Sequence, residues 1–267
     1  MATRSKVALI LDADLLVYSA CTAVETSVEW SPGIWSVASS APEALGHFEA
    51  ELRGLLEAIK ETTPVDEVVL ALSNYDSPAF RKVWMPSYKA NRVGNRKPTA
   101  FFPLREMLQA DYEVREVAGL EGDDVIGILL TDDRYRPGQR KIAASIDKDM
   151  LTLAGEHINW RRSHGPFTVT EEEAEYVHLY QTLTGDSVDG YKGCPGVGPV
   201  TARKILGEQC EHDNLWDAVV EAYEEAGQSE REALATARMA RILRVQDYDF
   251  GNNKPIPWEP GGKHEEV

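Results

Sequence analysis

Short, continuous apolar runs alternate with longer amphipathic segments along the first part of the chain. The runs at 7–11 and 65–72 are typical of strands buried on both faces, and further strands are predicted at 112–117, 141–146 and within 157–169. Apolar residues at helical spacing predict helices over 15–24, 43–61, 100–109 and 121–130. This alternation predicts an α/β fold with a mainly parallel sheet.

The last hundred residues follow a different pattern. Helical spacing recurs over 171–184, from about 199, over 214–226 and over 230–245, and the arginines Arg238, Arg241 and Arg244 step by three along the last of these. We therefore expect an α/β unit at 1–169 and a helical unit at 170–267. Residues 27–40 hold Trp30 and Trp35 among Ser, Pro and Gly, which predicts a loop.

Length and composition exclude several classes of protein. The 267 residues, 43% of them hydrophobic, suit one large domain or one domain with a smaller appendage. The chain has no run of eighteen apolar residues and no signal-peptide pattern at its start, so we expect no membrane segment. The three cysteines have no metal-ligand spacing, and their odd number does not suit a disulfide framework. A reducing cytoplasm is therefore expected.

The net charge of −16 argues against a nucleic-acid partner, but the distribution of charge weakens that objection. The segment 78–97 contains six basic residues and no acid: Arg81, Lys82, Lys89, Arg92, Arg96 and Lys97. Aromatic residues stand among these cations, a mixture that suits single-stranded nucleic acid, whose bases stack and whose phosphates pair with Lys and Arg. A solvated loop remains the alternative for this segment.

Carboxylates follow several of the predicted strands. Asp12 ends the first, Asp76 follows the second, and Asp147 and Asp149 follow the strand at 141–146. Parallel strands end at one edge of a sheet, so these side chains are expected to converge there. For Asp12 alone, a helix-capping role is the alternative.

Two further groups of acids lie outside the strands. Glu121, Asp123 and Asp124 open a helix, and the helix dipole accounts for one or two of them. Asp186 and Asp189, three residues apart, are predicted to face the same way from one helical turn. Carboxylates crowded in this way suit a divalent cation such as Mg²⁺.

A glycine-rich segment, 193–198, runs directly into the helix predicted from Pro199. Gly196 and Gly198 would let the backbone approach a ligand closely, and the helix start offers free N–H groups. This arrangement suits a nucleic-acid backbone next to the acids at 186 and 189.

Together these motifs resemble the flap endonuclease and 5′-exonuclease superfamily, and among its members the 5′–3′ exonucleases of short-tailed phages. The resemblance spans nearly the whole chain. It rests on Leu11-Asp-Ala-Asp-Leu-Leu-Val-Tyr18, Asp76 with Phe80-Arg-Lys82, Tyr88-Lys-Ala-Asn-Arg92, Glu121-Gly-Asp-Asp-Val125, Asp147-Lys-Asp149, Gly185-Asp…Asp-Gly-Tyr191 and Ala240-Arg-Ile-Leu-Arg244.

The resemblance implies a fold and a set of ligands. The expected fold is a Rossmann-like, PIN-type nuclease domain at 1–169, whose segment 78–97 forms an arch or gateway, and a helical domain at 170–267 with a helix-hairpin-helix at 186–206. Two Mg²⁺ ions are implied, for which Mn²⁺ can substitute, and a K⁺ ion at the hairpin. The implied metal ligands are Asp12, Asp76, Glu121, Asp123, Asp124, Asp147, Asp149, Asp186 and Asp189, with Asp14 as an auxiliary candidate.

The resemblance also implies roles in catalysis and in DNA binding. Lys89 and Arg92 would hold the scissile phosphate, and the catalytic carboxylates would be Asp12, Asp76, Asp123 and Asp147. The implied DNA-binding residues are Arg81, Lys82, Tyr88, Lys89, Arg92, Lys97, Lys192, Gly196, Gly198, Thr201, Arg203 and Lys204.

The implied activity is metal-dependent 5′–3′ exonuclease cleavage with flap and RNase H-like activity, leaving 5′-phosphates. The implied partners are DNA with a 5′ end or flap, RNA–DNA hybrids and phage replication proteins, for a monomer in the host cytoplasm. Three alternatives remain open: a haloacid-dehalogenase-type phosphatase, a non-catalytic helix-hairpin-helix module and a PIN-type ribonuclease. The phosphatase motif requires Thr where this chain has Leu16.

Overall fold

A six-stranded sheet organises the computed structural model, which describes residues 5–92, 94–162, 165–207 and 214–262. The strand order is β5-β4-β1-β6-β7-β8, and every neighbouring pair is parallel except β7 and β8. The predicted α/β fold with a mainly parallel sheet is therefore confirmed. The strands are β1 (Val7–Asp12), β4 (Glu67–Ala71), β5 (Glu113–Arg115), β6 (Arg140–Ala144), β7 (Gly155–Ile158) and β8 (Phe167–Val169).

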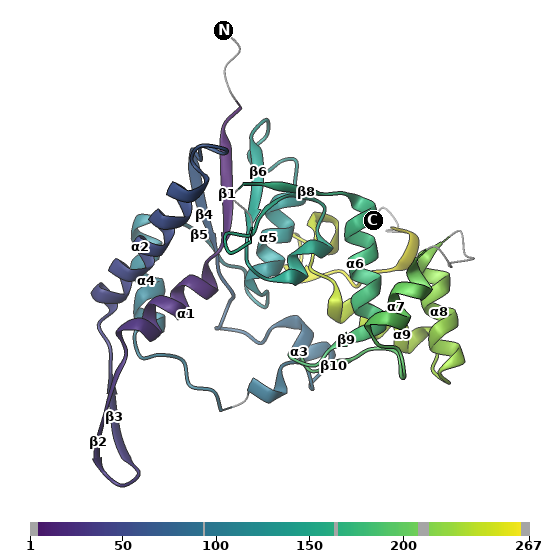
Figure 1. Cartoon of the computed structure of the whole chain (residues 1–267), viewed down its shortest axis with the longest axis horizontal. Coiled ribbons are helices and arrows are strands. Elements are labelled where there is room, and N and C mark those ends of the chain that lie inside the picture. The colour runs from purple at the N-terminus through teal and green to yellow at the C-terminus, as the bar shows by residue number, and fades with distance from the viewer. Residues whose placement is uncertain (1–4, 93, 163–164, 208–213, 263–267) are drawn as a thin grey trace.

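Helices cover both faces of the sheet (Figure 1). Successive residues of a strand point to opposite faces, so Leu9 and Leu11 of β1 join one buried cluster and Ile10 joins another. The first cluster packs against α1 (Ala13–Val24), α2 (Ala41–Ile59) and α4 (Phe101–Asp111), and the second against α5 (Gly122–Thr131). Because both faces are covered, a ligand of this sheet would be expected at the edge where the parallel strands end.

Residues 27–40 were predicted to form a loop, and this prediction is wrong. They form most of a two-stranded antiparallel ribbon, β2 (Thr26–Ser31) and β3 (Ile34–Ala38), that projects from the body in Figure 1. Val, Trp and Ile favour strands, and Gly33, with φ of 80°, makes the reversal. The Ser, Pro and Gly content that indicated a loop belongs to the reversal and its flanks.

The segment 78–97, called the strap below, crosses in front of the C-terminal edge of the sheet. It contains the short helix α3 (Phe80–Trp84) and the 3₁₀ turn η1 (Ala90–Arg92). The strap rests on a small hairpin, β9 (Gly185–Asp186) and β10 (Tyr191–Lys192), because Lys89 N–H donates to the carbonyl of Asp189 at 2.7 Å. Gly190 permits this approach, since a Cβ there would lie 2.8 Å from the carbonyl oxygen of Ser87.

The helical unit has its own core. It consists of α6 (Glu171–Thr184), α7 (Pro199–Leu206), α8 (Leu215–Glu225) and α9 (Glu230–Ala240), which pack around Leu183, Trp216 and Tyr223. In the part of the chain that the structure describes, no helix is long and apolar enough to cross a membrane. The unit boundary predicted at residue 170 falls between β8 and α6 but stays a prediction.

The helix predicted over 230–245 ends earlier, at Ala240. The chain then turns inward, and Ile242 and Leu243 join the buried cluster around α5. Gly127 makes room for them, because a Cβ there would lie 2.2 Å from the carbonyl oxygen of Leu243. The remaining elements are η3 (Val245–Asp247), β11 (Tyr248–Asp249), β12 (Lys254–Pro255) and η4 (Pro260–Gly262).

This early end breaks up the arginine face that the helical pattern predicted. Arg241 is buried and its Nε donates to Asp247 at 2.8 Å, while Arg244 pairs with Glu171 at 3.0 Å. These arginines therefore join segments of the protein to each other.

Candidate active site

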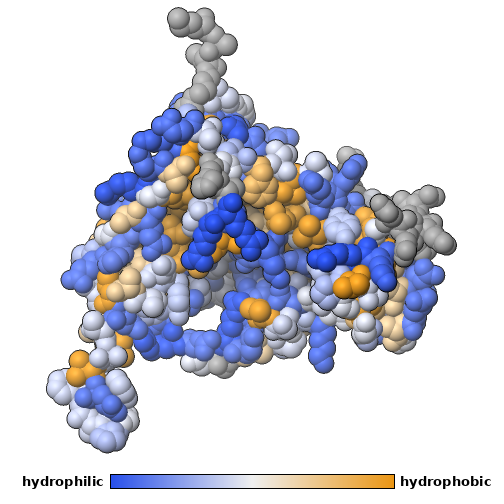
Figure 2. Space-filling model, viewed as in Figure 1, coloured by the Kyte–Doolittle hydropathy of each residue, from blue (hydrophilic) through white to orange (hydrophobic). Residues whose placement is uncertain are grey.

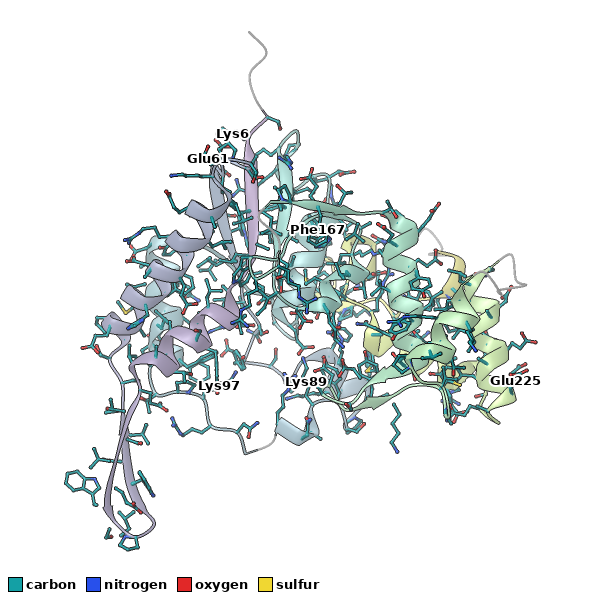
Figure 3. The ribbon with its side chains drawn as sticks, viewed as in Figure 1. Lys6, Glu61, Lys89, Lys97, Phe167 and Glu225 are labelled. Atoms are coloured by element: carbon teal, nitrogen blue, oxygen red, sulfur yellow. The ribbon has the colours of Figure 1, made fainter. Side chains whose placement is uncertain are left out.

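A cavity of about 630 Å³ lies where the C-terminal edge of the sheet faces the strap. Figure 2 shows the molecule hollowed here, with hydrophilic side chains around the hollow, and Figure 3 shows Lys89 and Lys97 on the strap side. Seven of the nine predicted metal ligands line the cavity: Asp12, Glu121, Asp123, Asp147, Asp149, Asp186 and Asp189. They come from the end of β1, the start of α5, the turn after β6 and the β9–β10 hairpin.

The deepest carboxylates are poorly solvated and close to one another. Asp12 accepts a hydrogen bond from Ser145 Oγ at 2.8 Å, yet burial and the charge of Asp14 raise its pKa to about 7. Burial and the charge of Asp12 likewise raise the pKa of Asp123 well above its ordinary value. Such carboxylates do not all ionise easily without a cation, which makes this wall a candidate cation site.

A second group of acids surrounds the 3₁₀ turn η2 (Lys148–Thr152). Asp147 caps this turn by accepting from Asp149 N–H at 2.9 Å, and Asp149 in turn accepts from Gln181 Nε2 at 2.5 Å. Burial and the charge of Asp147 raise the pKa of Asp149 to about 6. Lys148 Nζ bridges to Asp186 Oδ2 at 3.3 Å, so the turn and the hairpin are tied together.

Asp186 and Asp189 share the cavity, but not by the predicted helical turn. They stand at the two sides of the hairpin reversal, where Asp186 Oδ1 accepts from the N–H groups of Val188, at 2.7 Å, and Asp189, at 3.2 Å. Gly190, with φ of 78°, completes the reversal. The i, i+3 spacing therefore brought the two acids together through a turn of different geometry.

Lys89 and Arg92 extend from the strap into the cavity. Lys89 Nζ lies 2.6 Å from Glu121 Oε1 and 3.5 Å from Asp189 Oδ2, and Arg92 pairs with Asp189 at 2.8 Å. Lys89 has φ of 51°, an uncommon conformation for a non-glycine residue that costs free energy and concentrates at functional sites. The surrounding structure thus holds this lysine at the cavity.

Three residues predicted to meet metal or DNA are instead buried. Asp124 is fully buried and forms a bidentate ion pair with Arg81, with both distances 2.7 Å. Leu243 N–H donates a hydrogen bond to the same carboxylate at 3.1 Å. Arg81 is only 3% exposed, so it cannot contact a DNA backbone. Tyr88 is also 3% exposed, and its hydroxyl donates to Glu121 at 2.9 Å, so it cannot stack on a base. All three were misassigned because sequence does not show burial.

Glu121 lines the cavity but is already paired. Arg81 at 3.0 Å and Lys89 at 2.6 Å both contact its carboxylate. Burial alone would raise the pKa of Glu121, but the charges of Lys89 and Arg81 outweigh burial and lower it to about 2. Glu121 is therefore fixed as an anion that joins the strap to α5.

Asp76 does not line the carboxylate cavity. It is exposed, and it lies beside a neighbouring hollow along the strap. Ser73 and Asp14 stand in the cavity instead, with Ser73 N–H donating to Asp14 at 2.9 Å and Arg105 pairing with Asp14 at 2.9 Å. The chain leaves β4 at Ala71, so Asp76 is too far along it to face the sheet edge.

Some cavity residues were not predicted as site residues from sequence. Tyr18 and Lys148 line it, and so does Arg162. Its position next to a second arginine was the available signal. Arg105 and Gln181 gave no such signal, because their contacts with Asp14 and Asp149 join residues far apart in the chain.

The segment after the hairpin presents the predicted backbone-binding residues at the surface. Lys192, Thr201, Arg203 and Lys204 are exposed. Gly196 has φ of 79°, whereas Gly198 has φ of −100° and open space around its Cα. The left-handed conformation that glycine adopts easily is thus at Gly196 and not at Gly198.

The strap cations differ in their availability. Lys82 is exposed, but Lys97 Nζ lies 4.5 Å from the centre of the Phe101 ring and donates to Tyr75 Oη at 2.9 Å. Burial lowers the pKa of Lys97. Lys97 is thus partly withdrawn from solvent into an aromatic cluster.

The donor set fits hard divalent cations. Among the described residues, no three His, Cys, Asp or Glu side chains converge tightly enough to enclose one ion. Mg²⁺ keeps several waters and usually takes only one or two carboxylates plus substrate oxygens, so an open, carboxylate-lined cavity suits it. Asp12 and Asp123 in one group, and Asp147, Asp149 and Asp186 in the other, are the residues that would hold such ions.

Carboxylates gathered at the C-terminal edge of a parallel sheet, with a lysine and an arginine facing them, define a class of enzymes that act on phosphate esters. The family model for the N-terminal resolvase-like domain of 5′-3′ exonucleases matches residues 7–181. The chain therefore belongs to the 5′-3′ exonuclease family and is a nuclease of that type.

Individual relatives agree with the family model. The exodeoxyribonuclease of Enterobacteria phage T3 is 31% identical, with 94% of this chain and 92% of the relative covered. The exonuclease of Escherichia phage T7 is 30% identical, with 94% and 93% covered. The fold resembles the crystal structure of the T5 D15 protein with metal ions, with a TM-score of 0.64 and 13% identity over 89% of this chain and 90% of that one.

Proposed function

We propose that this protein is a Mg²⁺-dependent 5′–3′ exonuclease that also cleaves flaps and RNA–DNA hybrids, leaving a 5′-phosphate and a 3′-hydroxyl. One observation carries the proposal: eight carboxylates from four separate segments line a single cavity together with Lys89 and Arg92. One structural neighbour, the T5 D15 flap endonuclease, was solved as a pseudo-enzyme-product complex with DNA and metal ions, which supports DNA as the substrate here.

Bound divalent ions would supply a nucleophilic hydroxide and neutralise charge on the phosphate. The carboxylates of Asp12 and Asp123, and those of Asp147, Asp149 and Asp186, would hold these ions. Lys89 would donate to a non-bridging oxygen of the scissile phosphate, and Arg92 would hold the same group from the exposed side. Both cations are pre-positioned by Asp189, so little rearrangement is needed when the phosphate arrives.

The glycine-rich segment 193–198 and the helix α7 would hold the duplex at a distance from the cleaved bond. The Gly196–Val197–Gly198 backbone and the start of α7 face solvent, and Lys192, Arg203 and Lys204 surround them. We propose that this helix-hairpin-helix, with a K⁺ ion, contacts phosphates without reading sequence. The strap would guide the 5′ end towards Lys89.

The test is a digest of 5′-labelled blunt, flapped and hybrid duplexes in Mg²⁺ and in EDTA. We expect Mg²⁺-dependent release of 5′-phosphorylated products from the 5′ end. Asp149→Ala should abolish cleavage and retain duplex binding, because it removes a cavity carboxylate. Asp76→Ala is the matched control and should cleave normally, because Asp76 is exposed outside the cavity.

Three outcomes would contradict the proposal. Cleavage that persists in EDTA would remove the metal requirement, and wild-type turnover by Asp149→Ala would remove the role of the cavity. Binding without any cleavage would identify a non-catalytic helix-hairpin-helix module.

A further inference from the structure

Gln181 on α6 is the one uncharged side chain found bonded directly to a carboxylate of the η2 turn within the described residues. Its Nε2 donates to Asp149 Oδ1 at 2.5 Å, from a helix that belongs to the other unit of the protein. The side chain is 6% exposed, so bulk water does not compete with this hydrogen bond. Three residues later, at Thr184, the same helix ends and leads into the hairpin acid Asp186.

The other end of the Gln181 amide is left unsatisfied. Within the described part of the chain, its Oε1 is buried and has no hydrogen-bond partner. Turning the amide round would place Oε1 against the carboxylate oxygen of Asp149, and two acceptors at that distance repel each other. Buried amides normally satisfy both ends, so an orientation that satisfies only the carboxylate calls for an explanation beyond stability.

The remaining contacts of Asp149 show what this hydrogen bond does. The backbone of Asp149 is fixed at both ends, because its N–H donates to Asp147 at 2.9 Å and its carbonyl accepts from Thr152 Oγ1 at 2.8 Å. The side chain still has freedom about its own bonds. Gln181 removes that freedom by holding Oδ1, which directs Asp149 to line the cavity in one orientation.

We propose that Gln181 is a positioning residue for the second group of metal-binding carboxylates. It sets the orientation of Asp149, and, because it is on α6, it sets that orientation relative to the hairpin that carries Asp186. Lys148, which bridges to Asp186 at 3.3 Å, ties the same two segments from the exposed side. The inference rests on the metal-dependent cleavage proposed above, but it concerns how the ligands are held.

The test is Gln181→Met, which keeps an unbranched side chain of similar length but removes the donor. Hydrogen-bond partners of metal ligands alter metal affinity or activity by about 10–100-fold when they are removed. We therefore expect Mn²⁺ binding, measured by calorimetry on the full chain without DNA, to weaken by about this factor. Single-turnover cleavage at limiting Mg²⁺ should slow in parallel, and excess Mg²⁺ should restore much of it.

The matched control is Thr182→Val. Thr182 is the next residue, fully buried, and its hydroxyl donates only within the helix, to the carbonyl of His178 at 3.0 Å among the described contacts. This variant should lower thermal stability and leave Mn²⁺ affinity unchanged. Should Gln181→Met fail to fold, Gln181→Ala provides the same comparison with a smaller side chain.

Wild-type Mn²⁺ affinity and wild-type cleavage at limiting Mg²⁺ in folded Gln181→Met would overturn the inference. A cleavage defect that excess Mg²⁺ does not restore, with unchanged Mn²⁺ affinity, would also overturn it and make Gln181 a packing residue. Failure of the wild-type protein to cleave in Mg²⁺ would instead refute the proposed function, so the two failures are distinguishable.

Discussion

Replacing Arg81 with Met should destabilise the protein strongly and weaken DNA binding only as a consequence. Arg81 stands in a basic segment and would ordinarily be mutated to test nucleic-acid contact. In the structure its guanidinium is enclosed by Asp124 and Glu121 and by the carbonyl oxygens of Met239 and Arg241. Its burial opposes its charge, but the paired carboxylates outweigh burial and keep its pKa well above the ordinary value.

The size of the effect follows from what the substitution leaves behind. Met fills part of the volume, but Asp124 stays fully buried without its counter-charge. Breaking a buried pair by removing one partner typically costs about 3–5 kcal/mol. The total free energy of unfolding of a globular domain is about 5–15 kcal/mol, so this loss is a large fraction of the stability.

The assay is urea unfolding followed by tryptophan fluorescence, with Lys82→Met as the control. Lys82 is the next residue and is exposed, so its substitution should change the free energy of unfolding by less than about 0.5 kcal/mol. The double variant Arg81→Met with Asp124→Leu should recover part of the loss, because it removes both charges. A stable Arg81→Met protein with reduced affinity for DNA would refute the buried-pair interpretation.

Three further predictions follow from the site and the helical unit. Lys89→Ala should lower kcat by about 10²–10³-fold with little change in KM, whereas Lys82→Ala should leave kcat unchanged. An increase in KM alone would mean that Lys89 only helps to bind the substrate. Gly196→Val should weaken binding of all duplexes alike by straining a positive φ and blocking close approach of the phosphates, while Gly198→Val, which strains no positive φ, should weaken it less, and KM on duplex substrates is the measure. Burial and the charge of Arg241 lower the pKa of His178 from 6.5 to about 3, so its contribution to the free energy of unfolding is complete above pH 6.5 and is lost as the pH falls towards 3. In His178→Gln the urea midpoint should therefore depend less on pH between 6.5 and 3 than in the wild type. The same dependence of the midpoint on pH in both proteins would contradict this.

Sequence pattern predicted most of the sheet because buried parallel strands are nearly continuous apolar runs. The short apolar run at 7–11, followed directly by acids, indicated a buried parallel strand and little else. The ribbon at 26–38 was missed because its large apolar residues, such as Trp30 at 72% exposed, do not join the buried core. The end of α9 was missed because Ile242 and Leu243 continue a helical pattern while packing on a distant helix.

The candidate site was predicted to a similar depth and for similar reasons. Acids that end strands or open α5 reached the cavity, because topology alone brings them to one edge. Asp124 and Arg81 did not, since whether a charge faces the cavity or a buried partner depends on contacts more than forty residues away. Gln181 was not predicted for the same reason, because the sequence around an uncharged amide in an amphipathic helix does not indicate which distant residue it contacts.

The inward turn of the chain after α9 affects how the protein can be made. The apolar cluster around α5 is completed by Ile242, Leu243 and Tyr248. The backbone N–H of Leu243 also donates a hydrogen bond to the carboxylate of Asp124. Domains usually fold in order as they leave the ribosome, N-terminal first. Here the α5 side of the sheet is covered only once residues 242–248 have packed against it. Because Leu243 N–H donates to Asp124, the partner of Arg81 in the strap, we expect the strap to be fixed against α5 only after this later segment is in place.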